Sequence, residues 1–422
     1  MAERPAGDGG VAAMKQPQLW IIWGNWGPYH HARFAALRAA AAPLGLDVRG
    51  VELVPRSDIY EWQAAAGSDA IWRLPVNERE MEFKPVRLAR MLRPLLRAER
   101  PAVVFVPSYW HWSLECNLLA RAAGARIVMM NESHAGTERA RGLKRWIKRW
   151  IKRRIVRRFH AALVGGTPHK RHFANLGLAE NLIATGYDAV DNDFYAREAA
   201  KVREDAESVR SRWGLPPRYV LSLGRLVEKK NLSTLVEAHR TRCAEAGDTT
   251  APDLVIVGSG PLDGALRVQC RDAGIEVIER AGEPPFPDPG APAGARAFFY
   301  GFRQIAENPV FYALADAFVL PSSHEEWGLV VNEAMACGLP VIVSRTAGCA
   351  EDLVRDGVNG WTFHPTSAPE LAACLTRLDE SAELRARMGA RSAAIIASWG
   401  CDAFAAGALA ATRACAPGLF AR

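Results

Sequence analysis

Short runs of apolar residues alternate with helix-like segments along most of the chain. In the first half they predict buried strands at Leu19–Trp23, Val48–Leu53, Ala102–Val106, Arg126–Met130 and Ala161–Val164. In the second half they recur at Tyr219–Leu223, Leu254–Val257, Phe298–Gly301, Ala315–Leu320 and Leu339–Ser344. Amphipathic patterns typical of helices lie between these runs, as at Val86–Ala98. Strands that alternate with helices predict βαβ units, in which a parallel sheet carries helices on both faces.

The length of the chain predicts more than one domain. It has 422 residues, which is more than a single hydrophobic core usually serves. The stretch Glu198–Arg218 is charged, poor in large apolar side chains, and separates the two sets of strands. The expected parts are a disordered lead-in (1–16), a Rossmann-like domain (17–195), a linker (196–218), a second Rossmann-like domain (219–398) and a last helix (399–422).

The composition is that of an ordinary globular protein. With 49% hydrophobic and 23% charged residues, the chain does not fall in a disordered class. The 8 cysteines are scattered without a C-x-x-C pair, which leaves zinc and disulfide frameworks unsupported and fits a reducing cytoplasm. The first sixteen residues lack an apolar segment typical of a signal peptide. No apolar run approaches the roughly 18 residues that a membrane span needs.

One segment accounts for the net charge of +7. Leu143–Phe159 holds nine Lys and Arg and no acid, so subtracting it leaves −2 for the rest of the chain. Its tryptophans and isoleucines recur at helical spacing, opposite the basic side chains, as in a helix that lies on anionic lipid. An ordinary packed helix with a solvated basic face is the alternative, and no motif supports nucleic acid. The expected membrane contacts are Trp146, Trp150, Lys144, Arg145, Lys148 and Arg149.

The stretch from Pro321 to Gly338 (PSSHEEWGLVVNEAMACG) combines a strand end, a loop and a helix start. Gly338 is a good helix terminator, and Pro340 supports the same stop. Ligands of open α/β sheets bind at the carboxyl ends of strands, and the free N–H groups of a helix start favour an anion such as a diphosphate. Glu325 and Glu333 flank this start, and carboxylates accept hydrogen bonds from sugar and ribose hydroxyls. The stretch therefore predicts a nucleotide-sugar site.

The same stretch resembles a known family. Its spacing, Glu325, seven residues and Glu333, is similar to the E-x7-E motif of the retaining glycosyltransferases of family 4, and the similarity continues through Ser344, Gly348 and Glu351 to Gly360. The resemblance implies the GT-B fold: two Rossmann-like α/β domains that face a central cleft, with a C-terminal helix crossing back to the first domain. It assigns the acceptor to the first domain and the nucleotide sugar to the second.

The resemblance also implies roles for individual residues. Gly224-Arg225 and Lys230 are similar to the family's G-R-L-x-x-x-K-N segment, whose two cations reach the diphosphate, and Lys229 is expected to be solvated. The expected nucleotide and diphosphate contacts are Gly224, Arg225, Lys230, Phe302, Arg303, Leu329, Val330 and Glu333. The expected donor-sugar contacts are Glu325, Glu326, Trp327 and Gly328.

Two places in the first half are expected to face the same cleft. The loop after the first strand, Gly24-Asn25-Trp26-Gly27-Pro28, is not a G-x-G-x-x-G fingerprint and a plain tight turn would explain it. The resemblance implies instead that Gly27, Pro28 and Tyr29 form an acceptor-side loop. It also implies a cleft histidine near the donor sugar, for which His134 is the candidate as a catalytic residue beside Glu325. The alternative for His134 is a loop histidine that caps a helix.

Asp191-Asn192-Asp193 has the form of the D-x-D motif of metal-dependent glycosyltransferases. In family 4 the equivalent stretch is the entry to the hinge, and enzymes of this fold class neutralise the diphosphate with protein groups. We therefore expect no metal and no cofactor beyond the nucleoside diphosphate sugar that acts as donor.

The expected function is a retaining transfer of a sugar from a nucleoside diphosphate sugar to an acceptor hydroxyl. A lipid-linked acceptor in cell-surface polysaccharide or glycolipid assembly is expected, on the cytoplasmic side and peripheral to the inner face of the membrane. A soluble small-molecule acceptor is one alternative, and a non-hydrolysing sugar-nucleotide epimerase or an inactive binding scaffold are others. The sequence does not identify the sugar, the base, the acceptor or the linkage.

Overall fold

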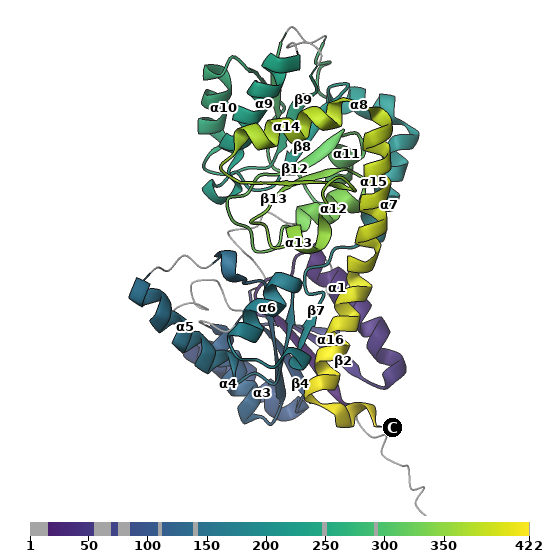
Figure 1. Cartoon of the computed structure of the whole chain (residues 1–422). Coiled ribbons are helices and arrows are strands. Elements are labelled where there is room, and N and C mark those ends of the chain that lie inside the picture. The colour runs from purple at the N-terminus through teal and green to yellow at the C-terminus, as the bar shows by residue number, and fades with distance from the viewer. Residues whose placement is uncertain are drawn as a thin grey trace, which may run out of the picture.

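The structure is a computed structural model of the whole chain. It describes residues 16–54, 69–74, 85–108, 112–137, 142–246, 251–290 and 294–421. The described residues form two α/β units, one above the other in Figure 1. The predicted lead-in at 1–16 lies, except for its last residue, outside the described residues, as do Tyr109, Trp110 and His111.

The first unit is built on a seven-stranded parallel sheet in the order β3-β2-β1-β4-β5-β6-β7. Its strands are β1 (Gln18–Trp23), β2 (Asp47–Glu52), β3 (Ile71–Arg73), β4 (Val103–Pro107), β5 (Arg126–Asn131), β6 (Ala161–Val164) and β7 (Ile183–Thr185). Its helices are α1 (Pro28–Ala41), α3 (Pro85–Glu99), α4 (Trp112–Ala122), α5 (Gly142–Val156) and α6 (Thr167–Asn175).

The second unit is another seven-stranded parallel sheet, in the order β10-β11-β9-β8-β12-β13-β14. Its strands are β8 (Tyr219–Leu223), β9 (Asp253–Val257), β10 (Glu276–Glu279), β11 (Arg296–Phe299), β12 (Ala317–Leu320), β13 (Val341–Ser344) and β14 (Gly360–Phe363). Its helices are α9 (Leu232–Ala246), α10 (Asp263–Asp272), α11 (Asn308–Ala313), α12 (Leu329–Ala336), α13 (Ala350–Leu353), α14 (Ala368–Asp379) and α15 (Ala382–Ile396).

Each sheet has one hydrophobic core on each face, because successive side chains of a strand point to opposite sides. In β1, Trp20 and Ile22 pack with α3 and α4, whereas Leu19, Ile21 and Trp23 pack with α1 and the last helix. The strands are buried on both faces, as expected for parallel sheets covered by helices. The predicted parallel α/β architecture is therefore confirmed.

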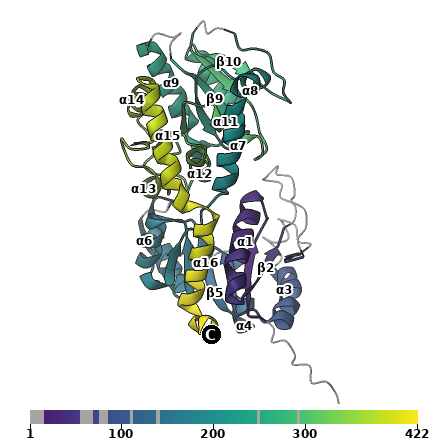
Figure 2. The same cartoon turned by 90° about the vertical axis from the view of Figure 1, so that its right-hand side faces the viewer.

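The last helix, α16 (Cys401–Cys415), returns to the first unit. It packs against α1, β6 and β7, and both views show it beside α1 (Figures 1 and 2). Gly407 permits this approach, because a Cβ there would lie 2.1 Å from the backbone oxygen of Thr185. The structure thus has the crossover helix that the GT-B resemblance implied.

The stretch predicted as a linker forms two helices, α7 (Asn192–Glu204) and α8 (Ala206–Trp213). Tyr195, Ala199 and Trp213 lie in one of the two cores of the second unit. The expected boundary after residue 195 therefore falls inside α7, and the packing divides the chain before this helix. The apolar positions that pack here are too widely spaced to stand out among the charged residues.

Candidate functional site

The strand order of the second sheet defines where a ligand binds. The chain runs outward in opposite directions from β8 and β12, which are neighbours, so a crevice opens between the loops that follow them. The loop after β8 holds Gly224 to Lys230, and the loop after β12 holds Pro321 to Gly328. Two segments almost one hundred residues apart are thus brought to one edge, as the motif comparison predicted.

A cavity of about 310 Å³ lies beside these loops. Tyr29 comes from the first unit, and the rest of the wall comes from the second. The lining residues are Tyr29, Leu223, Gly224, Arg225, Val257, Gly258, Ser259, Gly260, Phe302, Arg303, Ile305, Asn308 and Val330. The cavity therefore collects Gly224, Arg225, Phe302, Arg303 and Val330 from the predicted nucleotide contacts.

Two glycines let the loops of the cavity approach each other. Gly258 has φ +136°, and a Cβ there would lie 1.9 Å from the Gly224 backbone oxygen. Gly260 has φ +159°, and a Cβ there would lie 2.4 Å from the Leu226 backbone oxygen. Side chains at either position would push the loops after β8 and β9 apart and change the shape of the cavity.

The helix predicted from Trp327 begins two residues later. Gly328 is its N-cap, with φ +106°, and α12 starts at Leu329. Leu329 and Val330 are half-buried, and Val330 lines the cavity, so the first turn of the helix lies beside the space that a ligand would enter. The predicted contact Leu329 is not part of the cavity wall. The backbone N–H groups of a first turn have no partner within the helix and can bind an anion.

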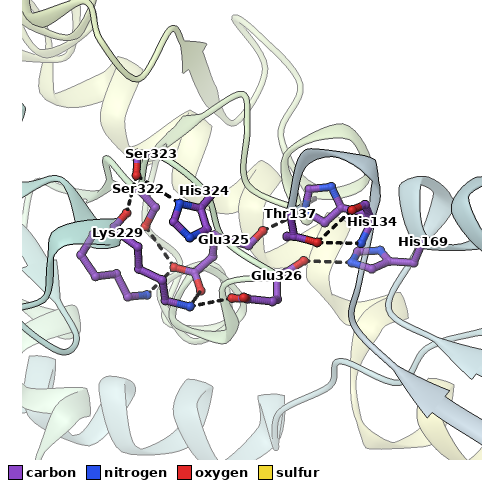
Figure 3. A network of polar contacts seen from close by, with 10 residues as sticks. His134, Thr137, His169, Lys229, Ser322, Ser323, His324, Glu325 and Glu326 are labelled. Carbon is purple, nitrogen blue, oxygen red and sulfur yellow. Dashed lines mark hydrogen bonds and ion pairs between the residues drawn. The ribbon is translucent and has the colours of Figure 1, made fainter. Parts of the chain in front are cut away.

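Glu325 is held as a charged carboxylate. Its Oε2 accepts a hydrogen bond from the Ser322 hydroxyl at 3.0 Å and forms an ion pair with Nζ of Lys230 (Figure 3). Burial raises the pKa of Glu325, but the ammonium groups of Lys230 and Lys229 outweigh this effect and hold the pKa below its ordinary value. Lys230 thus contacts the predicted sugar-binding glutamate directly.

Lys229 corrects one expectation. We predicted a solvated side chain, but its Nζ lies 2.6 Å from Glu326 Oε2 and 3.6 Å from Glu325 Oε1 (Figure 3). The short turn Glu228–Lys230 directs Lys229 and Lys230 to the same two glutamates. The side chains of adjacent residues usually point in different directions, so the sequence analysis assigned only Lys230 to the site.

Glu333 lies in the opposite kind of environment. It is 0% exposed, and its carboxylate accepts hydrogen bonds from the hydroxyls of Tyr29 and Tyr312, the latter at 2.9 Å. Burial raises its pKa to about 7 even though these hydrogen bonds lower it. The predicted ribose contact is therefore covered by Tyr29, which reaches it from the first unit, and a ribose hydroxyl can meet Glu333 only if Tyr29 moves.

Trp327 does not line the cavity as predicted. It is 1% exposed, its ring packs 5.4 Å from that of Trp399, and its Nε1 donates to Asn332 at 2.8 Å. Gly166 of the first unit lies against it, since a Cβ there would be 2.8 Å from the ring. The side chain of this expected donor-sugar contact therefore fills the junction between the units.

His134 faces the second unit instead of the cavity. Its Nε2 lies 2.9 Å from the backbone oxygen of Glu325, and His169 makes the matching contact at 2.9 Å to the backbone oxygen of Glu326 (Figure 3). Thr137 closes the turn around His134 through a hydrogen bond to its backbone oxygen at 2.8 Å. We did not single out His169, and its only signal was its place after the Gly165-Gly166 pair at the end of a predicted strand.

Of the three residues predicted to form the acceptor-side loop, one lines the cavity. Gly27 caps α1, Pro28 begins it, and Tyr29 reaches the cavity wall. The amide of Gly27 donates to Nδ1 of His30 at 3.0 Å, which fixes the start of the helix. Tyr29 is therefore the member of this loop that the structure places at the site.

Two carboxyl groups of the first unit also lie close to this junction. Asp188 is 1% exposed, and burial together with the neighbouring Glu132 raises its pKa well above the ordinary value. Gly165 leaves room for it, because a Cβ there would lie 2.5 Å from its Oδ2. A pair of buried acids holds a shared proton more readily than two charges.

Asp191 in the D-x-D-like stretch caps a helix. Its side chain accepts a hydrogen bond from the amide of Phe194 at 2.9 Å, which is the ordinary role of an aspartate at the start of α7.

The basic helix α5 divides its apolar stripe in two. Val156, the last residue of α5, and Phe159, just beyond the helix, are buried in the core of the first unit. Trp146, Ile147 and Trp150 are instead 66%, 44% and 48% exposed. Lys148 and Arg149 are exposed beside them, and the side chains of Lys144 and Arg145 lie outside the described residues. Within the described ranges, no helix is both long and apolar enough to cross a bilayer.

Two family models match the chain in tandem. One for a glycosyl transferase 4-like domain matches residues 30–188, and one for glycosyl transferases group 1 matches residues 217–381. Together they cover most of both units and leave out β1, α7, α8, α15 and α16.

Individual curated relatives share about 30% of their residues with this chain over the matched segments. The chain is 30% identical over 223 residues to D-inositol 3-phosphate glycosyltransferase of Thermomonospora curvata, covering 51% of this chain and 47% of that protein. It is 30% identical over 211 residues to GDP-mannose-dependent alpha-(1-6)-phosphatidylinositol monomannoside mannosyltransferase of Mycolicibacterium smegmatis, covering 47% and 48%. The chain thus spans about half the length of these curated relatives.

Solved structures agree on the fold. The crystal structure of Anabaena Alr3699/HepE in complex with UDP has a TM-score of 0.63 to this chain at 17% identity, covering 93% of this chain and 98% of that one. At this coverage the similarity extends over both units. The chain therefore has the GT-B fold and belongs to the group 1 glycosyl transferases.

Proposed function

We propose that this chain is a retaining, metal-independent glycosyltransferase that moves a sugar from a nucleoside diphosphate sugar to an acceptor hydroxyl. The observation that carries the proposal is the meeting of Arg225, Lys230 and Glu325 at the crevice between β8 and β12, beside a cavity. The relatives that match the chain are glycosyltransferases by name, which supports the same reaction class.

The charges of the site suit a diphosphate leaving group. Arg225 is exposed at the cavity wall, and Lys230 lies at the wall of a smaller adjoining pocket together with Gly224. With the first-turn N–H groups of α12, these cations would stabilise the negative charge that grows as the nucleotide departs. A carboxylate-held metal is not required for this role, which is why we propose a metal-independent reaction.

The glutamates would bind the two ends of the donor. Glu325, kept ionised by its lysines, would accept hydrogen bonds from sugar hydroxyls and stabilise positive charge on the anomeric carbon. Glu333 would accept the ribose hydroxyls once Tyr29 withdraws. Glu326 lies next to Glu325 and is bound to Lys229, which supports a position at the same edge of the proposed sugar site.

The proposed step breaks the bond between the anomeric carbon and the phosphate oxygen. The acceptor oxygen bonds to that carbon on the same face, and its proton passes to the leaving phosphate oxygen. The products are a glycoside with the configuration of the donor and a nucleoside diphosphate. No carboxylate nucleophile is needed in this front-face attack on an oxocarbenium-like centre.

The test begins with a panel of nucleotide sugars and thermal unfolding, because a ligand that binds only the native state raises the melting temperature. The donor found in this way is then incubated with acceptors while nucleotide release and product configuration are measured by NMR. Nucleotide release that requires an acceptor and gives a retained product supports the proposal. An inverted product excludes retention, and conversion of the nucleotide sugar without an acceptor indicates an epimerase.

We further propose that the acceptor is lipid-linked and that α5 contacts an anionic membrane surface on the cytoplasmic side. Trp146, Ile147 and Trp150 form an exposed apolar patch within a helix that carries no acid. Basic residues near an anionic leaflet contribute about 1 kcal/mol each, and exposed tryptophans insert at the interface. One relative is named for a phosphatidylinositol-based acceptor, which supports a lipid-linked substrate.

Vesicle flotation tests the membrane contact. Wild type should float with vesicles that contain phosphatidylglycerol and stay behind with vesicles of phosphatidylcholine alone. Exchanging Trp146 and Trp150 for serine should abolish flotation, whereas Trp361→Ser, in the second unit, should not change it. If wild type floats with neither kind of vesicle, the membrane contact is excluded and a soluble acceptor is favoured. If it floats equally with both, binding does not depend on an anionic surface and that part of the proposal fails.

A further inference from the structure

Two histidines of the first unit bind the backbone of the loop that carries Glu325. His134 follows β5, and His169 lies in the first turn of α6, so they come from different elements. Their Nε2 atoms lie 2.9 Å from the backbone oxygens of Glu325 and Glu326, respectively. Figure 3 shows both imidazoles beside this loop, with the lysine side of Glu325 facing away from them.

The backbone around each ring fixes its tautomer. The amide of Gly136 donates to Nδ1 of His134 at 3.2 Å, and the amide of Gly166 donates to Nδ1 of His169 at 3.2 Å. Because each Nδ1 is an acceptor, the proton of the neutral ring lies on Nε2, which donates to the glutamate carbonyl. His134 is 6% exposed and His169 is 0% exposed, so water does not compete for these contacts.

The loop between the histidines and the lysines has little freedom on its other sides. The amide of Gly348 donates to the backbone oxygen of Glu325 at 3.1 Å. A Cβ at Gly348 would lie 1.9 Å from the Glu326 backbone oxygen and 2.9 Å from Cε1 of His169. The peptide units of Glu325 and Glu326 are therefore held by one contact within their own unit and two from the other unit.

We infer that His134 and His169 are positioning residues that orient the Glu325 loop only when the two units are closed. Glu325 is contacted on its side chain by Lys230 and Ser322, from its own unit, and on its backbone by the other unit. Opening the cleft removes the two histidine hydrogen bonds and releases the peptide units that carry the carboxylate. Closure thus assembles the donor-sugar site in addition to bringing the acceptor near.

This inference rests on the proposed glycosyl transfer for its kinetic consequence, and it changes the role expected of His134. We expected His134 to lie in the cleft near the donor sugar, but its Nε2 is bound to a carbonyl oxygen and its Nδ1 to a backbone amide. His134 acts through the orientation of Glu325, with His169 as an equal partner.

Matched substitutions of His169 test the inference. Glutamine places an amide N–H near the position of Nε2, whereas asparagine is shorter and reaches only the position of Nδ1. His169→Asn should lower kcat by about 10- to 100-fold with the KM for the donor nearly unchanged, because a misplaced group slows the reaction more than it weakens binding. His169→Gln should recover most of that loss, and the same pair at His134 should follow the same order.

Arg171→Ala provides the control, since Arg171 lies in the same helix and contacts Glu351 of the other unit without touching the loop. Its kcat should equal that of wild type. Equal kcat values for the asparagine and glutamine variants, or a loss that appears only in KM, would overturn the inference.

Amide hydrogen exchange of residues 322–330 separates this inference from the proposed function. Exchange in this loop should be faster in His169→Asn than in His169→Gln, whether or not a sugar donor has been found. If wild type transfers no sugar from any donor but the loop still shows this order, the proposed function fails and the positioning role stands. If the loop exchanges equally in both variants, the positioning role fails.

Discussion

Glu325 and Glu333 belong to one motif and lie eight positions apart, yet their surroundings differ in every respect that controls a carboxyl group. Two ammonium groups and a serine hydroxyl surround Glu325, and its pKa is held below the ordinary value. Tyrosine hydroxyls surround Glu333, no cation contacts it among the residues the structure describes, and burial raises its pKa to about 7. Glu325 is charged at neutral pH, whereas Glu333 is divided between charged and neutral forms near pH 7.

The comparison shows that the spacing of the motif fixes where the two glutamates lie, whereas the surrounding side chains determine whether each carboxyl group is charged. A charged group is suited to stabilise positive charge that develops in a transition state. A carboxyl near its own pKa is suited to hydroxyl partners, because it accepts hydrogen bonds when ionised and can donate one when neutral. Each of the following changes tests one side of this difference.

The largest effect is expected from Glu325→Gln. The amide has the shape of the carboxylate but no charge, so Lys230 loses its counter-ion, Lys229 keeps only Glu326, and the sugar carbon loses its stabilising charge. We expect kcat to fall by about 100- to 1000-fold, as for other preorganised electrostatic contacts. Donor-dependent nucleotide release measures it. Glu237→Gln removes an exposed carboxylate of the same unit and should leave kcat unchanged; a similar kcat for both variants would contradict the assignment.

The next effect concerns stability and pH at Glu333. Its pKa is raised from 4.5 to about 7 in the folded protein, so the unfolded chain releases this proton more readily. The contribution of this group to stability is complete below pH 4.5 and is lost as the pH rises through 7. The free energy of unfolding of wild type should therefore fall by about 3 kcal/mol relative to Glu333→Gln over this window.

Urea unfolding at several pH values between 4.5 and 8 measures this difference. Comparison with the variant matters because burial lowers the pKa of His169 to about 4. The contribution of His169 to stability depends on pH in the opposite direction. It is complete above pH 6.5 and is lost as the pH falls toward 4. Both proteins share the histidine effect, so it cancels in the difference. Parallel pH curves would show that Glu333 is ionised in the folded protein like an ordinary glutamate.

A smaller effect is expected from Tyr29→Phe. The phenol hydroxyl of Tyr29 occupies Glu333 and must leave before a ribose hydroxyl can bind there. Removing it should tighten binding of the nucleoside diphosphate by about 3- to 10-fold, since a net hydrogen bond contributes about 1 kcal/mol. Titration calorimetry with UDP, GDP and ADP measures it. Tyr312→Phe removes the hydrogen bond that Glu333 receives from its own unit and should give no gain. Weaker binding by Tyr29→Phe would mean that its hydroxyl contacts the nucleotide.

The smallest effect is expected where the two units touch outside the cleft. Arg171 and Glu351 form an ion pair, but their side chains are 59% and 48% exposed. An exposed pair contributes about 0–1 kcal/mol, so Arg171→Ala should change the free energy of unfolding by less than about 0.5 kcal/mol. Urea unfolding checks this value. A larger loss would show that the outer contacts, and not the histidines and Tyr29, hold the units together.

The sequence alone was sufficient for the features that depend on local order. Strand and helix periodicity defined the two parallel sheets, and the spacing around Gly224–Lys230 and Glu325–Glu333 located the crevice. These patterns work because each one lies within a single βαβ unit, whose geometry is set by neighbouring residues. The apolar stripe of α5 was also visible, since helical spacing is a local property.

The tertiary structure decided which of these residues face one another. Tyr29 and Glu333 are about three hundred residues apart, and His169 and Glu326 are separated by more than one hundred and fifty. No local pattern encodes such contacts, which depend on how the second unit and α16 pack against the first. The same packing helped to bury Trp327. Packing within each unit paired Lys229 with Glu326 and covered one half of the α5 stripe while leaving Trp146 exposed. Sequence periodicity predicts which side chains lie on an apolar face. Whether such a side chain is buried depends on which surface, often distant in sequence, packs against it.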